Sequence, residues 1–191
     1  MGKENIDLRA VAVCGHICSG KSSIVNYLSE LYNWDVISFG KYVRHLADTK
    51  GLPSTRETYQ ILGQQLINEL GAQQFLYNTI QFNQPISTIH LYDGVRHMSV
   101  LAELRLAYRS TLVIYLDVSD SVRYARFKTR AADGDPSMFY DEFLQLSKRP
   151  VEQENSRISR VADLHIDASS SFSAITTEIK AMLLKNQFVE P

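Results

Sequence analysis

Eight consecutive residues, Gly15 to Ser22, have the types and spacing of a loop that binds phosphate. They read Gly-His-Ile-Cys-Ser-Gly-Lys-Ser and match the pattern G-x-x-x-x-G-K-[ST]. Glycine lets the backbone approach a polyphosphate closely and adopt positive φ, so that backbone N–H groups can surround it. Lys21 would bring a positive charge to the β- and γ-phosphates of ATP, and the Ser22 hydroxyl would bind Mg²⁺. The residues predicted to bind the nucleotide are Gly15, His16, Ile17, Cys18, Ser19, Gly20, Lys21, Ser22 and Ser23.

The residues on either side of this loop favour the same interpretation. Residues 8–14 form a short, mostly apolar run that is typical of a buried strand. After the loop, apolar side chains recur at helical spacing, at Ile24, Tyr27, Leu28 and Leu31. The N-terminus of such a helix directs unpaired N–H groups and a partial positive charge at the bound phosphates. The sequence therefore predicts a strand, a phosphate-binding loop and a helix in succession.

Asp93 is the second candidate for metal binding, because it follows another apolar run at residues 86–92. A carboxylate there would hold Mg²⁺ beside Ser22, directly or through water. Gly94 would leave room for a phosphate next to it. The alternative interpretation is an ordinary Asp-Gly turn.

Two pairs of arginines are candidates for contacts with phosphate. Arg126 and Arg130 lie one helical turn apart, so they share a face, and we predict a catalytic role for them around the migrating phosphoryl group. A solvated basic face is the alternative. Arg44 and Arg96 each come shortly after a predicted strand and could bind an acceptor's phosphate. The alternative is that both are ordinary surface arginines, which would give the same sequence pattern. Whether Arg123 or Arg157 also contacts phosphate stays open.

The elements that must position these groups alternate between strand and helix. Strands are predicted at 8–14, 34–38, 86–92, 111–118 and 164–167, with helices between them. This alternation predicts one α/β domain over residues 1–191, with a five-stranded parallel sheet covered by helices on both faces in three layers. Since ligands bind at the carboxyl ends of parallel strands, the phosphate loop, Ser38 and Asp93 should meet there.

Two segments exceed what the sheet needs. About residues 39–84 lie nearly fifty helical residues, which we interpret as a helical flap that binds the acceptor. Ser38 should cap its first helix, a capping box at Ser54-Thr55-Arg56-Glu57 should open the second, and Gly71 should end that second helix. About residues 126–150 should form a short lid. In and after that region we expect a turn at 131–136, then a helical piece with Phe139, Phe143 and Leu146, and then a polar segment over 148–160.

Composition narrows the class of protein. Hydrophobic residues make up 45% and charged residues 21% of 191 residues, as in ordinary globular proteins. The formal net charge of −1 argues against a nucleic-acid partner bound by bulk electrostatics. Cys14 and Cys18 flank the loop; buried or loop-lining thiols in a reducing compartment are favoured over a redox pair. With no run long enough for a membrane span, we expect a cytoplasmic monomer or homodimer.

The chain resembles the nucleoside monophosphate kinase-like group of P-loop phosphotransferases. The resemblance rests on the loop Gly15–Ser22, the segment 37–44, Asp93-Gly94-Val95-Arg96, and the block 126–130. In adenylate kinases, similar arginines bind the acceptor's phosphate, which implies this role for Arg44 and Arg96. The arginine block resembles the start of the lid that closes over ATP. The aromatic and proline residues of the adenylate kinase Asp-Gly segment are absent here.

The C-terminal part is more similar to dephospho-CoA kinase, through the block 126–130, residues 161–167 and the serine-rich turn that follows. The resemblance implies ATP–Mg²⁺-dependent transfer to a small nucleotide or nucleoside-like acceptor, first of all a (deoxy)nucleoside monophosphate. Dephospho-CoA kinase and nucleoside kinase activity are the alternatives. If the acceptor is a hydroxyl, Asp35 or Asp93 is the candidate base. A reading of another class is a regulatory ATP-binding module without turnover.

Overall fold

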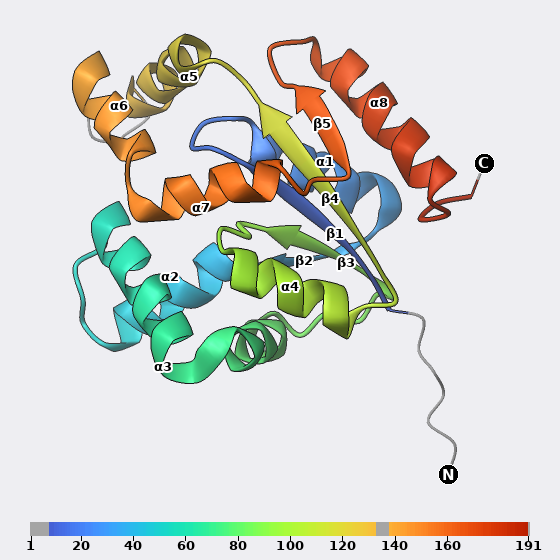
Figure 1. The fold of residues 1–191 in the computed structure, drawn as a ribbon, viewed down its shortest axis with the longest axis horizontal. Coiled ribbons are helices and arrows are strands. Elements are labelled where there is room, and N and C mark those ends of the chain that lie inside the picture. Colours follow the sequence, from blue (N-terminus) through green and yellow to red (C-terminus); the bar gives the residue numbers. More distant parts are fainter. Residues whose placement is uncertain (1–7, 133–137, 191) are drawn as a thin grey trace.

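The computed structural model of the protein describes residues 8–132 and 138–190, and its centre is one parallel sheet (Figure 1). Every pair of neighbouring strands is parallel, in the order β2-β3-β1-β4-β5. The five strands are β1 (Arg9–Gly15), β2 (Asp35–Ser38), β3 (Ile89–Asp93), β4 (Ser110–Asp117) and β5 (Leu164–Asp167). The predicted five-stranded parallel sheet is confirmed. Since all strands run the same way, their carboxyl ends meet at one edge, and β1 delivers the phosphate loop to its middle.

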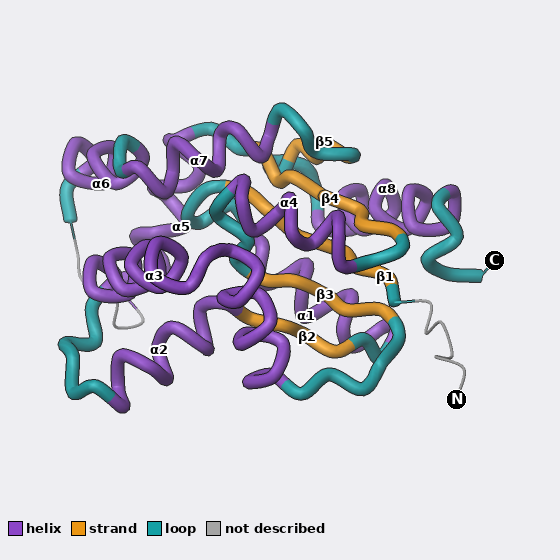
Figure 2. The backbone as a smooth tube through the Cα atoms, turned by 60° about the horizontal axis from the view of Figure 1, so that its bottom comes forward, coloured by secondary structure: helices purple, strands orange, loops and turns teal. Residues whose placement is uncertain are grey.

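Helices cover both faces of the sheet, so the fold has three layers, as predicted (Figures 1 and 2). Successive side chains of β1 point to opposite faces: Ala10, Ala12 and Cys14 join one core, and Val11 and Val13 join the other. The helices of the first core are α2 (Phe39–Thr49), α3 (Arg56–Asn83), α4 (Met98–Ala107) and α7 (Pro150–Ser159). Those of the second core are α1 (Lys21–Tyr32) and α8 (Phe172–Lys185).

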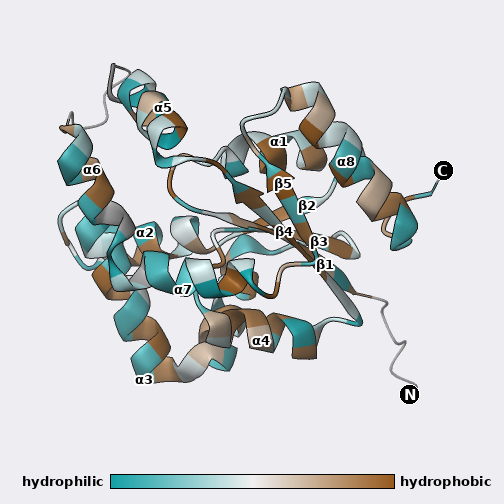
Figure 3. Cartoon of the chain, turned by 45° about the horizontal axis from the view of Figure 1, so that its top comes forward, coloured by the Kyte–Doolittle hydropathy of each residue, from teal (hydrophilic) through white to brown (hydrophobic). Residues whose placement is uncertain are grey.

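The hydropathy of the chain explains why these layers form. Figure 3 shows hydrophobic residues gathered along the central strands and on the sides of the helices that face them. Leu28 on α1 and Ile179 on α8 are fully buried, and burial of each such side chain is worth about 1.5–3 kcal/mol. Leu31, predicted to lie on the same apolar face as Leu28, is 45% exposed.

The helices between β2 and β3 occupy the predicted position. Ser38 caps α2, because its hydroxyl accepts a hydrogen bond from the Lys41 backbone N–H at 3.3 Å. The α3 cap is one residue later than expected: Thr55 accepts from the Thr58 N–H at 3.1 Å. The predicted box on Ser54 and Glu57 is therefore wrong. Gly71 has φ 80° and ψ 158° inside α3, which breaks the helix where the sequence predicted a helix end.

A small satellite core holds the next two helices, α5 (Asp120–Ala132) and α6 (Tyr140–Ser147), against the phosphate loop. Ile17 of the loop, Phe127 of α5 and Phe143 of α6 are its buried residues. Phe143 is fully buried, whereas Phe139, which precedes α6, is 81% exposed. Part of the predicted turn at 131–136 falls on residues 133–137, which lie outside the described residues.

The polar segment 148–160 is largely helix α7, which the sequence analysis did not predict. Its buried positions, Glu152, Asn155 and Ile158, recur every three residues and therefore lie on one face of the helix. Two of these three buried side chains are polar. A search for apolar periodicity misses a helix whose buried face is mostly hydrophilic.

Candidate functional site

The loop after β1 has the backbone that phosphate binding requires. Gly15 has φ 141°, and a Cβ there would lie 2.6 Å from both Leu116 O and Ser19 Oγ, so no other residue fits. Gly20 has φ 101° and occupies the cap position of α1, whose first residue is Lys21. The free N–H groups of the first helical turn thus face the carboxyl edge of the sheet. This part of the loop is built as the sequence predicted.

Lys21 lies folded against the loop itself. Its Nζ donates to Gly15 O at 2.8 Å and to His16 O at 2.7 Å. Burial first, and then the charge of Arg96, lowers the pKa of Lys21 to about 8. An ammonium has three donors, and these two carbonyls account for two of them. The side chain is half-buried rather than standing in open solvent, and it is positioned by the loop that it would serve.

Ser22 and Asp93 both line the cleft at this edge. Ser22 is in the first turn of α1, and Asp93 ends β3, in register with Val13 on β1 and Ser38 on β2. A hydroxyl and a carboxylate with phosphate oxygens and water form the oxygen-rich donor set that Mg²⁺ prefers. Within the described residues, no group of three or more His, Cys, Asp or Glu side chains could hold a metal alone. These residues fit an ion that arrives with a polyphosphate.

The α5 arginines contact the loop in three different ways. Arg126 donates to Ser19 O at 3.1 Å and to Ala168 O at 2.6 Å, which ties the loop to the turn after β5. Arg130 is exposed and reaches Cys18 Sγ at 3.9 Å. Arg123 is 2% exposed, pairs with Asp120, and lies 5.4 Å from the centre of the Phe143 ring. Arg126 and Arg130 line the cleft, whereas Arg123 supports the loop from behind.

Four further arginines line the cleft, and the sequence analysis named only two of them as candidates for contacts with phosphate. Arg44 comes from α2, Arg96 follows β3, Arg56 begins α3, and Arg149 precedes α7. Arg149 donates to Gln60 Oε1 on α3 at 2.7 Å, so it joins α7 to the helical flap. Arg56 and Arg149 were not predicted as cleft residues, because Arg56 was assigned only to a helix-capping motif and Arg149 lies in a polar stretch without a motif. Arg157 pairs with Glu154 at 2.5 Å and does not line this cleft.

Glu152 is the acidic residue that the sequence analysis missed. It is 3% exposed, its Oε2 lies 2.7 Å from His16 Nδ1, and its Oε1 lies 3.5 Å from a guanidinium nitrogen of Arg96. Burial alone would raise the pKa of Glu152, but the His16 hydrogen bond and the charges of Arg96 and Lys21 lower it to about 2. The carboxylate is therefore ionised at neutral pH. His16, which stands at a variable position of the motif, makes a specific contact.

Together these residues form one cleft of about 1310 Å³ along the carboxyl edge of the sheet. Among the described residues, Lys21 and six arginines line it, together with the acidic side chains of Glu57, Asp93 and Glu152. We call the part near Arg126, Arg130, Ala168 and Phe172 the α5 side. The part near Arg44, Arg56, Arg96 and Arg149 is the α3 side, and it also carries the aromatic residues Phe39, Tyr59 and Phe75. The cleft has the charge and size for two anionic ligands.

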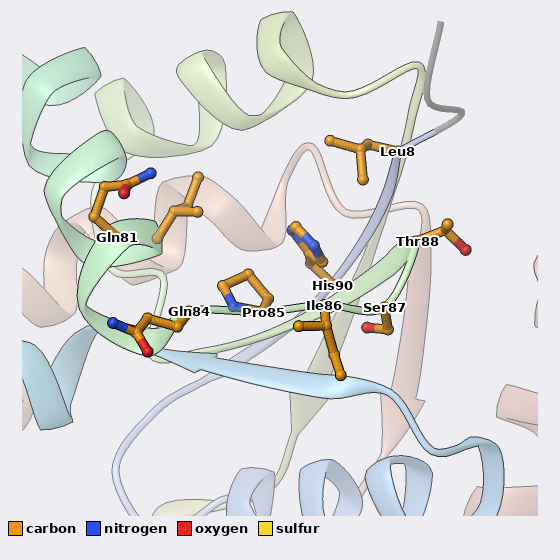
Figure 4. A pocket seen from close by; sticks show the side chains of 9 residues that line it. Leu8, Gln81, Gln84, Pro85, Ile86, Ser87, Thr88 and His90 are labelled. Atoms are coloured by element: carbon orange, nitrogen blue, oxygen red, sulfur yellow. The ribbon is translucent and has the colours of Figure 1, made fainter. Parts of the chain in front are cut away.

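A second hollow, of about 490 Å³, lies at the opposite end of the strands (Figure 4). Its lining is made mainly of apolar and amide side chains, among them Leu8, Ile80, Pro85, Gln81 and Gln84. No lysine or arginine belongs to its described lining, so it lacks the charge for a phosphate. The phosphate chemistry belongs to the carboxyl edge.

Asp35 is not a candidate base. It starts β2, at the opposite end of that strand from the cleft, and it is not among the cleft's lining residues. Its carboxylate accepts hydrogen bonds from the backbone N–H groups of Ser87 at 2.6 Å and Ile86 at 2.7 Å. The Ser87 hydrogen bond is the largest cause of its lowered pKa. Asp35 holds the chain just before β3, so of the two candidate bases named for a hydroxyl acceptor, Asp93 lines the cleft and Asp35 does not.

No protein-family model matches the chain. Among curated proteins it is similar to a UPF0200 protein of Pyrococcus horikoshii, with 26% identity over 78% of this chain and 83% of that protein. It is also similar to a UPF0200 protein of Methanoculleus marisnigri, with 24% identity over 93% of this chain and 97% of that one.

Solved structures resemble the chain in fold. Shikimate kinase from Bacteroides thetaiotaomicron superposes with a TM-score of 0.60 and 12% identity, covering 94% of this chain and 98% of that one. A gluconokinase from Sinorhizobium meliloti 1021 gives a TM-score of 0.53 and 16% identity, over 95% and 97% of the two chains. None of the described helices combines the length and apolarity needed for a bilayer. With its phosphate loop, five-stranded parallel sheet and flanking helices, the chain has the fold of the P-loop kinases.

Proposed function

We propose that the protein is an ATP- and Mg²⁺-dependent kinase that transfers the γ-phosphoryl group to a small nucleotide-like acceptor, first of all a (deoxy)nucleoside monophosphate. The observation that carries this proposal is one cleft that is lined both by Lys21 of the phosphate loop and by arginines from several separate elements. A bound phosphate on each side would place donor and acceptor next to each other. Phosphoryl transfer needs this positioning more than it needs covalent chemistry from the protein.

The donor would bind on the α5 side. Backbone N–H groups of residues 15–23 would surround the triphosphate, with Lys21 directed to its β- and γ-phosphates. Arg126 and Arg130 would stabilise the negative charge that spreads over the migrating group. Ser22 and Asp93 would hold Mg²⁺, which neutralises phosphate charge. The exposed ring of Phe172 borders this side and offers a contact for a nucleotide base.

The acceptor would bind on the α3 side, so we assign the flap of residues 39–84 to acceptor binding and part of 126–150 to a lid. Arg44 and Arg96 would hold its phosphate by paired hydrogen bonds. Phe39 and Phe75 stack at 5.5 Å and line this side, where a planar base can pack. The Ser38 hydroxyl already caps α2, so it would contribute mainly by fixing that helix. A phosphate acceptor is ionised at neutral pH and needs no strong base.

A panel of acceptors tests the proposal. A coupled assay with Mg²⁺-ATP should compare nucleoside monophosphates, nucleosides and dephospho-CoA with shikimate and gluconate, after which the neighbouring kinases are named. We expect the highest turnover with one nucleoside monophosphate. A best acceptor among dephospho-CoA or nucleosides would replace the first choice by the stated alternatives. Hydrolysis of ATP at background rate with every acceptor would favour a regulatory ATP-binding module. A cytoplasmic location and a monomeric or homodimeric state belong to the same proposal.

A further inference from the structure

One helix, α7, contacts three separate parts of the cleft. Arg149, at its N-terminal boundary, hydrogen-bonds to Gln60 on α3. Glu152 reaches both His16 of the phosphate loop and Arg96 after β3. Glu154 accepts a hydrogen bond from the Met98 N–H at the start of α4, at 3.3 Å. None of the proposed catalytic residues lies on α7, but α7 contacts the phosphate loop that contains Lys21.

Glu152 stands out among these contacts because it is buried and its two carboxylate oxygens serve two different elements. A buried charge is tolerated only when it is paired and hydrogen-bonded. Here Oε2 is bonded to His16 Nδ1 at 2.7 Å, and Oε1 lies 3.5 Å from Arg96. His16 Nε2 in turn lies 3.4 Å from the Ser156 hydroxyl, one helical turn further along α7. The His16 side chain thus connects the phosphate loop to two residues of α7, Glu152 and Ser156.

Among the described residues, Glu152 is an ion-pair partner of Arg96. The Arg96 side chain keeps 37% of its surface exposed and lines the cleft, while Glu152 lies on its buried side. A guanidinium has five donors, so contact with one carboxylate leaves others for a ligand. An arginine side chain also loses rotamer entropy when it is ordered. A fixed partner that orders it before binding lowers the entropic cost of binding.

We propose that Glu152 is a positioning residue, whose carboxylate holds Arg96 towards the acceptor's phosphate and joins it through His16 to the loop that binds ATP. This inference rests on the proposed function and adds to it a residue that makes no contact with the reacting atoms. It predicts that the affinity of the α3 side for phosphate depends on Glu152 acting through Arg96.

Inorganic phosphate is the probe, and Glu154 supplies the matched control. Protein saturated with Mg²⁺ and the non-hydrolysable analogue AMP-PNP would be titrated with inorganic phosphate by calorimetry. The variants are Glu152→Gln, Arg96→Ala, the double variant, and Glu154→Gln. Glu154 lies on the same helix but holds Met98 and Arg157, and it does not line the cleft. Circular dichroism checks that each variant folds, and Glu152→Asp replaces Glu152→Gln if the latter does not fold.

We expect Glu152→Gln to weaken phosphate binding about tenfold, the size typical for loss of one charge-assisted contact. Glu154→Gln should bind phosphate as the wild type does. Adding Glu152→Gln to Arg96→Ala should have little further effect, because the carboxylate then has no guanidinium to position. With Glu152→Asp, which keeps the charge but shortens its reach, phosphate binding should weaken as well.

Three results would overturn the inference. They are equal phosphate affinity in the wild type and Glu152→Gln, additive losses in the double variant, and no phosphate binding by the wild type loaded with AMP-PNP. Failure of the proposed function itself would look different, because the wild type would then fail to bind Mg²⁺-AMP-PNP before any phosphate is added. In that case both the function and the inference fall.

Discussion

The two sides of the cleft are built by different means. On the α5 side the phosphate loop is one continuous motif, and its shape is fixed by local backbone: Gly15 and Gly20 have positive φ, and Lys21 folds onto loop carbonyls. On the α3 side the charged groups come one at a time from α2, α3, the turn after β3 and the start of α7. Only the fold brings them together.

This difference separates two chemical tasks within a single molecule. Wrapping a triphosphate requires backbone N–H groups, which one short segment can supply. Recognising an acceptor requires side chains at several distances and angles, which only separate elements can supply. We therefore expect changes on the α5 side to abolish transfer and changes on the α3 side to alter acceptor affinity.

The largest effect should follow from Lys21→Ala. Removing a cation that stabilises the migrating phosphoryl group should lower kcat about 10²–10³-fold, in the range for loss of one preorganised charge-stabilising donor. The fold should persist, because the lost contacts are two hydrogen bonds to Gly15 and His16. Steady-state kinetics and circular dichroism measure the two effects. Turnover within a few-fold of the wild type would contradict the expectation that changes on the α5 side abolish phosphoryl transfer.

Acidification should break the ion pairs around Glu152 and so lower the stability of the folded protein. Its pKa in the folded state is about 2, below the ordinary value of 4.5. The stability that it contributes is therefore complete above about pH 4.5 and is lost as pH falls towards 2, at most about 3 kcal/mol. Urea unfolding at pH 7 and pH 3 measures this slope. Glu152→Gln should flatten it, and an identical slope in that variant would show that the carboxylate is not the group responsible.

Arg96→Ala should act mainly on the acceptor. Losing a charged hydrogen bond is worth about 1.5–3 kcal/mol, so the acceptor's KM should rise about 10- to 100-fold. The KM for ATP should change little if the two sides act separately. Arg44→Ala, which removes the α2 arginine of the α3 side, should behave in the same way. An equal rise in the KM for ATP would mean that the division into two sides is wrong.

The smallest expected effect concerns the start of α3. Thr55→Ala removes the cap of the helix that carries Arg56 and Gln60, and should cost about 1 kcal/mol of stability. Ser54→Ala is the control, because Ser54 has no capping role in the structure. Thermal unfolding distinguishes the two variants. Equal melting temperatures would argue that the end of this helix is held by tertiary contacts instead.

The sequence predicted most of the fold and the backbone of the phosphate loop, because both depend on local patterns. Apolar strands, helical spacing and the loop motif each act within a few residues. Glu152 and Arg149 escaped because α7 buries polar residues, so its periodicity carries no apolar signal. Asp35 was a poor candidate already from the sequence, because it lies at the amino end of the predicted strand 34–38, whereas ligands bind at the carboxyl ends. In the structure, its carboxylate accepts hydrogen bonds from the backbone of Ile86 and Ser87, just before β3.

The most direct test is the identity of the product when the protein is incubated with Mg²⁺-ATP and a mixture of nucleoside monophosphates. Phosphorus NMR distinguishes a newly formed nucleoside diphosphate from free inorganic phosphate. The proposed kinase activity predicts one new diphosphate beside ADP, formed by the wild type and lost in Lys21→Ala. Release of inorganic phosphate alone, at the same rate in both proteins, would contradict it.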